Sequence, residues 1–196
     1  MATSRENKTL SQFKSKLIGG GARPNLFEVE LTTLPAGISW DAEIFRYLCK
    51  AAALPASNIA NIDIPFRGRI FKVAGERTFD VWQITVINDE DFRLRTAFEE
   101  WMNQISKLDN NVGATDPSAY MTNAKVFQLG RGAAPSSQDN AGSSNAVLKE
   151  YEFVDIFPTA ISAIDLSYDT SDASEEFTVD FQVQSFNVVG AGQPNG

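Results

Sequence analysis

The chain has 196 residues, a formal net charge of −8, one cysteine and no histidine. This length fits one domain, and a hydrophobic content of 43% is enough to build one core. Without histidine the chain lacks the commonest zinc ligand and the side chain that titrates near neutral pH. Serine–histidine and cysteine–histidine catalysis are therefore excluded, and the acidic balance argues against a surface that grips phosphate backbones.

The single cysteine, Cys49, lies in an apolar run and cannot form an internal disulfide. We expect it to be a buried, inert thiol, which fits a reducing compartment such as the cytoplasm. Residues 1–21 lack the apolar segment of a signal peptide, and no stretch approaches 18 apolar residues. We therefore expect neither secretion by a signal peptide nor a membrane anchor.

Residues 1–21 are expected to form an N-terminal arm ahead of the main domain. Leu10, Phe13, Leu17 and Ile18 recur at helical spacing after Thr9, and a triple glycine follows. Such an arm is typical of a segment that docks on a neighbouring subunit, and the alternative is a disordered terminus. The main β domain is expected over 22–188, and a flexible tail over 189–196.

The first half of the domain is predicted to be mostly extended. Residues 25–31 alternate, with Phe27, Val29 and Leu31 on one face, which indicates a strand. Residues 32–44, with Trp40, are predicted to be a surface insertion. Further extended segments are expected over 45–54 and 59–73, interrupted by prolines, and a better strand over 78–87.

One flanking helix is predicted over 92–105. Residues 88–91 offer N-cap candidates and an acidic first turn, which suits the helix dipole. The apolar stripe predicts a core face made of Phe92, Leu94, Phe98, Trp101 and Ile105.

The second half is predicted to return to strands. These are expected over 121–129, 149–157, 163–168 and 176–188, with a mobile surface loop over 130–146 that is rich in glycine, serine and asparagine. In the last two strands apolar residues alternate with acidic ones, so one side should be core and the other wet.

No catalytic, metal or cofactor site is predicted. Residues 169–175 lack the spacing of an EF-hand loop, and Gly190 and Gly192 have no helix after them to hold a phosphate. Composition leaves two alternatives open, a hydrolase that uses paired carboxylates and a monomeric β-sandwich binding module.

Several stretches resemble the tail tube proteins of T-even-type contractile bacteriophages. They are ARPNLFEV at 22–29, CKAAALP at 49–55, IFKVAGERTFDVW at 70–82, VINDE at 86–90 and YEFVDIFPT at 151–159. The resemblance covers about residues 22–188. It is also shared by tube subunits of phage-derived contractile injection systems and by tube-initiating baseplate proteins.

This resemblance implies a mainly β protein, a small β-sandwich or partial barrel with a flanking α-helix. Its inner sheets would join in a hexameric ring into a continuous barrel, which would also pair the exposed sheet edges. The implied function is structural and not enzymatic. Stacked rings would form the inner tail tube of the virion, assembled in the host cytoplasm, through which DNA passes without sticking. The implied partners are further copies, the tail sheath, the baseplate tube-initiator, the tape-measure protein and the tail terminator.

Two sets of residues are candidates for this assembly. Contacts between rings are expected at a basic segment broken by glycines, with Arg67, Arg69, Lys72 and Arg77 facing an acidic neighbour. The lumen is expected to be lined by acidic wet strand faces that carry Glu176, Asp180 and Asp165, because like charge keeps a polyanion from adhering.

Overall fold

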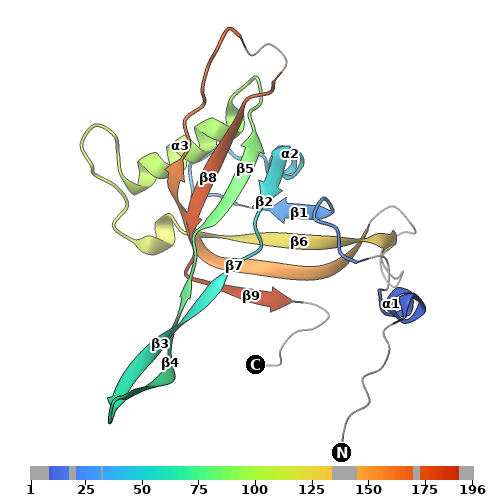
Figure 1. The fold of residues 1–196 in the computed structure, drawn as a ribbon. Coiled ribbons are helices and arrows are strands. Elements are labelled where there is room, and N and C mark those ends of the chain that lie inside the picture. The colour runs from blue at the N-terminus through green and yellow to red at the C-terminus, as the bar shows by residue number, and fades with distance from the viewer. Residues whose placement is uncertain (1–8, 18–20, 32, 134–144, 170–172, 190–196) are drawn as a thin grey trace, which may run out of the picture.

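The computed structural model describes residues 9–17, 21–31, 33–133, 145–169 and 173–189 (Figure 1). The helices are α1 (Leu10–Lys16), α2 (Ala42–Leu48) and α3 (Arg93–Ile105), with a 3-10 turn over Pro117–Ala119. The strands are β1 (Phe27–Glu30), β2 (Cys49–Ala52), β3 (Ser57–Phe66), β4 (Arg69–Phe79), β5 (Trp82–Ile87), β6 (Thr122–Ala133), β7 (Asn145–Ile161), β8 (Glu176–Gln182) and β9 (Ser185–Val189). The mainly β class predicted from the sequence is confirmed.

Most of the strands form one antiparallel sheet that folds into two layers at β7. Its order is β1-β6-β7-β8-β5-β2, and β9 pairs with the first part of β7. In Figure 1, β5 and β8 run across the direction of β6 and β7. The change of partner occurs near Asp155, which has a φ of 54° and donates its backbone N–H to the Asn123 side chain at 3.0 Å. This kink lets β7 pair with β6 before it and with β8 after it.

The core lies between these two layers and α3. Trp82 of β5 stacks on Phe153 of β7, with ring centroids 4.3 Å apart, and so joins the layers. On β8 the alternation is strict, since Phe177, Val179 and Phe181 are all buried. Burying a large apolar side chain of this kind stabilises the fold by roughly 1.5–3 kcal/mol.

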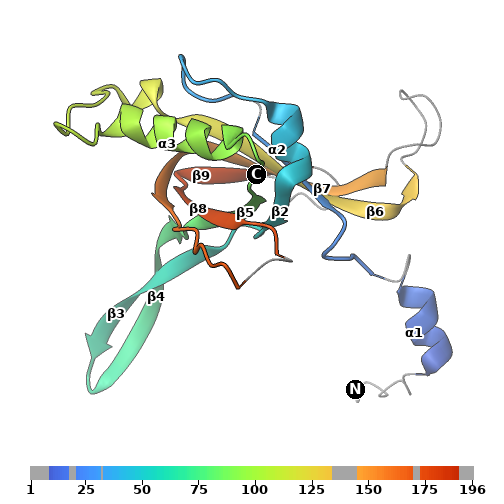
Figure 2. The ribbon, with the colours of Figure 1, turned by 90° about the horizontal axis from the view of Figure 1, so that it is seen from above.

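Helix α3 covers one side of the sheets (Figure 2). Leu94, Phe98 and Trp101 are buried, and Ile105 packs at the margin of the core. Phe92 differs from its predicted role as a packing residue. It is the N-cap, has a left-handed φ of 53°, and its side chain is 45% exposed. The predicted caps over 88–91 are also wrong, because no side chain caps α3.

Residues 33–48 differ from the prediction as well. Part of the segment predicted to be extended from residue 45 is helix α2, because the Asp41 carboxylate accepts the backbone N–H groups of Glu43 and Ile44, each at 3.1 Å. Trp40, predicted to lie in a surface insertion, packs against Phe45 and Phe98 instead. Its indole N–H also donates to the Leu31 carbonyl at 2.7 Å. This stretch closes one end of the core.

Four strand predictions need correction. Pro65 does not interrupt β3, because β3 pairs only with β4 and has an open side where proline costs no ladder bond. The strand expected over 78–87 divides between β4 and β5, and that expected over 176–188 divides between β8 and β9. Residues 163–168 form no strand. The alternation of apolar residues predicted which side chains are buried, but it did not predict where one strand ends and the next pairing begins.

The ends of the predicted loop and tail are strand. β6 continues to Ala133 and β7 begins at Asn145, so both ends of the loop predicted over 130–146 are strand, and residues 134–144 lie outside the described residues. Val189 belongs to β9, and 190–196 are likewise not described.

Candidate assembly surfaces

The β3–β4 hairpin extends β2 and β5 beyond the body of the domain (Figures 1 and 2). The backbone ladder continues between the two pairs of strands, since the Asp80 N–H donates to the Ala56 carbonyl and the Ala53 N–H to the Gln83 carbonyl. At the tip, Arg67 and Gly68 have φ values of 46° and 81°. Positive φ at both loop positions is the type I′ geometry that fits the twist of a hairpin.

The register of the hairpin sorts its side chains onto two unlike faces. One face is mostly apolar and carries Ile62, Ile64, Phe66, Phe71 and Val73, with Arg69 opposite Phe66 at its end. The other face carries the pair Asp63 and Lys72, whose charged atoms lie 3.9 Å apart, beside Pro65 and Ile70. Almost every residue of the hairpin is exposed, and a two-stranded ribbon is marginal in water on its own. The hairpin therefore has the properties of a segment that another surface covers.

The four basic candidates do not form one cluster on this hairpin. Arg67 and Arg69 lie at the tip, where the Arg67 guanidinium is 5.4 Å from the centre of the Phe66 ring. Lys72 faces Asp63, and Arg77 lies opposite Ile59 near the base. Only the first two combine exposure with a position at the far end of the hairpin.

The outer face of the β5–β8 layer holds two of the three lumen candidates. Glu176 and Asp180 alternate with the buried residues of β8, so they share the face that points away from the core. Asp180 accepts a 2.7 Å hydrogen bond from Gln83 of β5, and Glu176 forms an ion pair with Lys50 of β2. The remaining neighbours on β5 and β8 are mostly uncharged and polar. The face is therefore polar, and because Lys50 offsets the charge of Glu176, it is less acidic than the sequence analysis predicted.

Lys50 is the residue that the sequence analysis missed on this face. It directly follows the buried Cys49 in a strand, so alternation would have placed it on the wet side. Asp165 lies apart, in the exposed non-strand segment after β7, and does not share a strand face with Glu176 and Asp180.

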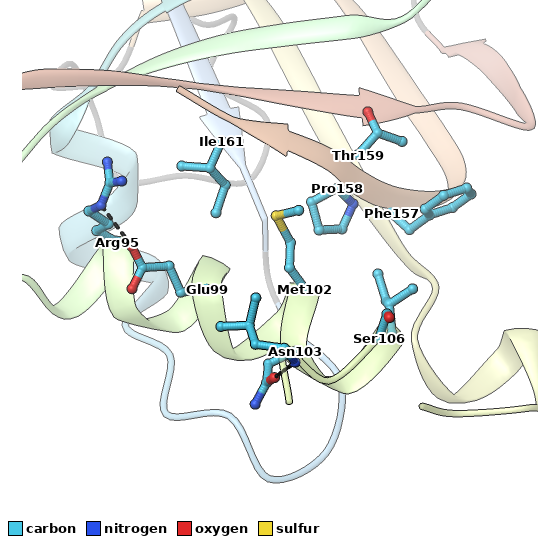
Figure 3. A pocket seen from close by; sticks show the side chains of 11 residues that line it. Arg95, Glu99, Met102, Asn103, Ser106, Phe157, Pro158, Thr159 and Ile161 are labelled. Atoms are coloured by element: carbon cyan, nitrogen blue, oxygen red, sulfur yellow. Dashed lines mark hydrogen bonds and ion pairs between the residues drawn. The ribbon is translucent and has the colours of Figure 1, made fainter. Parts of the chain in front are cut away.

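A groove of about 590 Å³ lies between α3 and the end of β7 (Figure 3). Its apolar lining includes Met102 and Ile105 from α3 and Phe157, Pro158 and Ile161 from β7. Arg95 and Glu99 mark one end, joined by a 2.8 Å ion pair. The groove has the dimensions and lining of a binding site, but it holds no pair of groups arranged for catalysis.

Nothing in the described part of the chain forms a reactive centre. Within those residues there is no group of cysteine, aspartate and glutamate side chains that could hold a metal ion. No described helix is both long and apolar enough to span a membrane. Burial raises the pKa of the Cys49 thiol from 9.0 to about 12, so it stays protonated and inert.

The described surfaces are those of a structural protein made to contact further proteins. The family model of the phage tail tube proteins matches residues 22–189, and the chain belongs to that family. It is 35% identical over 161 residues to the tail tube protein gp19 of Enterobacteria phage T4, which covers 82% of this chain and 88% of the relative. The predicted resemblance is confirmed, and the protein is a structural component of the virion tail and not an enzyme.

Two solved structures share the fold at low sequence identity. A chain of the anti-feeding prophage baseplate, in a six-fold symmetrised structure, aligns with a TM-score of 0.63 at 11% identity and covers 88% of this chain and 98% of its own. A chain of the extended sheath–tube complex of an extracellular contractile injection system aligns with a TM-score of 0.55 at 12% identity. It covers 94% of this chain and 100% of its own length.

Proposed function

We propose that copies of this chain join edge to edge into hexameric rings, and that these rings stack into the tube. The observation that carries the proposal is the layer β7-β8-β5-β2, which has an open edge on each side within the described residues. One edge is β2, and the other is the end of β7 from Phe157 to Ile161, which pairs only with β8. Open edges in a sheet are templates for pairing with another chain.

The strand directions support closure by a cyclic ring. Successive pairs in this layer are antiparallel, so β2 and the end of β7 run in opposite directions. Rotation about a ring axis keeps the direction of each strand along that axis. The β2 strand of one copy would therefore meet β7 of the next copy in an antiparallel pair, and the same contact would repeat until the ring closes.

The polar outer face of this layer would then line the lumen. Glu176 is neutralised by Lys50, and Asp180 adds one negative charge, so the wall would offer few cations to DNA phosphates. A polyanion is held on a surface chiefly by lysine and arginine contacts that release counterions. We infer that the genome passes such a wall without adhering.

The exposed hairpin would reach the adjacent ring, because it continues the strands beyond the body. The sheath, the baseplate tube-initiator, the tape-measure protein and the tail terminator are the further partners of a tube at its outer surface, its ends and its lumen. The sheath–tube and baseplate assemblies that contain chains of the same fold support the sheath and the baseplate as partners.

Negative-stain microscopy of the purified protein tests the proposal directly, with a variant aimed at one edge. The Ala53 backbone N–H points to Gln83 of β5, so alternation turns the Ala52 N–H towards the open edge. Ala52→Pro removes that donor, and Ala52→Ser keeps it. We expect rings or tubes from the wild type and Ala52→Ser, and a folded monomer from Ala52→Pro. A wild type that stays monomeric, or a proline variant that forms normal rings, contradicts the proposal.

A further inference from the structure

The N-terminal helix α1 has an apolar face that none of the described residues of its own chain covers. Leu10, Phe13 and Leu17 recur at spacings of three and four residues and are 69%, 61% and 44% exposed. Thr9 and Gln12 form a capping box that begins the helix. Seven residues are too few for a stable isolated helix, which needs on the order of 12–15 residues. A surface that covers this face would supply the missing stability.

The groove between α3 and β7 offers a complementary surface. Its floor is apolar, with Met102, Phe157 and Ile161 partly exposed along it (Figure 3). An amphipathic helix that lays its apolar face into an apolar groove is a recurring mode of recognition between proteins. The described chain places none of its own helices in that groove.

Charge favours the same pairing. Residues 1–21 contain four basic side chains and one acidic side chain, a net charge of +3, which leaves −11 for residues 22–196 out of the total of −8. Lys14 and Lys16 stand on the last turn of α1, whereas the charges at the end of the groove, Arg95 and Glu99, are paired with each other. A basic arm is attracted to the acidic domain of another copy, and this attraction also steers the encounter.

The arm is rooted far from the groove of its own domain. Gln128 of β6 donates to the backbone carbonyls of Arg23 and Leu26, at 2.8 Å and 2.7 Å, which holds the base of the arm beside β6. Figures 1 and 2 both show α1 at the opposite end of the molecule from α3. The groove, in contrast, is lined in part by the end of β7, the edge strand that would meet a second copy in the proposed ring.

We propose that α1 of one copy binds in the α3–β7 groove of another copy and fastens the assembled subunits together. The inference rests on the proposed ring-forming function. It adds a second contact between copies, made by α1 of one copy and the α3–β7 groove of another, to the pairing of strand edges. In this contact Phe13 fills the groove beside Met102, and the basic arm is attracted by the net negative charge of the other copy's domain.

Paired cysteine substitutions test this contact in the full-length assembled protein. The variant Phe13→Cys with Met102→Cys is treated with a short bismaleimide and run on a denaturing gel, and buried Cys49 does not interfere. The matched control is Phe13→Cys with Glu100→Cys, since Glu100 is on α3 but outside the groove. We expect a ladder of linked copies from the Met102 pair, at least about tenfold stronger than from the Glu100 pair, because docked groups react at a high effective concentration.

A second measurement separates docking from folding. Phe13→Ser should leave thermal unfolding of the domain unchanged, but it should shorten the tubes or lower their resistance to dilution. Ser11→Ala, on the polar side of α1, should leave both the unfolding and the tubes unchanged. Equal ladders from both cysteine pairs, or linkage confined to single chains, overturn the proposal. If rings or tubes form but the Met102 pair gives no ladder of linked copies, the α1 contact is overturned while the proposed function stands. A wild type without rings or tubes overturns both.

Discussion

The indole N–H of Trp101 donates a 2.7 Å hydrogen bond to the backbone carbonyl of Tyr120. This bond ties α3 to the segment that leads into β6, while the Trp101 ring lies fully buried 5.8 Å from the ring of Phe181 on β8. One side chain thus joins the helix, a connecting segment and the sheet.

Replacement of Trp101 by alanine should therefore destabilise the whole domain. We expect Trp101→Ala to lower the free energy of unfolding by about 3–5 kcal/mol, since it leaves a large cavity and an unpaired carbonyl. Urea denaturation followed by circular dichroism measures this loss. Glu100→Ala, an exposed neighbour on the same helix, should change it by no more than about 0.5 kcal/mol. An unchanged midpoint for Trp101→Ala would show that α3 does not belong to the core.

Charge reversal at the hairpin tip should weaken the stacking of rings. Arg67→Glu with Arg69→Glu turns two exposed cations into anions on an acidic protein, so tubes should become shorter and dissociate more readily while single rings persist. Electron microscopy across a salt series measures tube length. Arg93→Glu with Lys107→Glu makes the same change in net charge away from the hairpin and is the control. Tubes of normal length and salt resistance in the tip variant would exclude an ionic contact there.

Lysine at position 180 should slow the delivery of DNA. Asp180→Lys places a cation on the polar face of β8, where phosphates would be held, so ejection should slow or stall in particles with intact tubes. Glu176→Lys should act in the same direction and also lose the ion pair with Lys50, which makes it the less clean variant. Ejection is followed by release of DNA from virions, and Glu100→Lys on α3 is the control. Normal ejection by Asp180→Lys would exclude this face from the lumen.

Cys49 should resist alkylation until the protein unfolds. Its pKa is raised to about 12 by burial, so at pH 8 the folded thiol is neutral and shielded. The unfolded thiol ionises near its ordinary pKa of 9.0. Its contribution to stability is therefore complete below pH 9 and declines as the pH rises towards 12. Iodoacetamide labelling measured by mass spectrometry, with and without urea, checks this, and rapid labelling of the folded protein would contradict it.

The side-chain pattern predicted the buried positions better than the limits of the elements. Strict alternation placed Phe177, Val179 and Phe181 in the core, and helical spacing did the same for Phe98 and Trp101. Alternation reports which side of the chain is buried, but it continues unchanged when a strand ends one pairing and begins another. The break between β8 and β9 therefore left no mark that the pattern could show.

The assembly candidates show the same division. Composition and the quoted stretches determined the class of protein, the absence of histidine-dependent chemistry and the inert state of Cys49, because these depend on residue types and short motifs alone. Only the tertiary structure decided that Lys50 neutralises Glu176, that Asp165 leaves the strand face, and that α3 and β7 enclose an apolar groove. The first and last of these relationships join residues distant in the chain, and all three depend on strand register and helix packing, which local sequence does not specify.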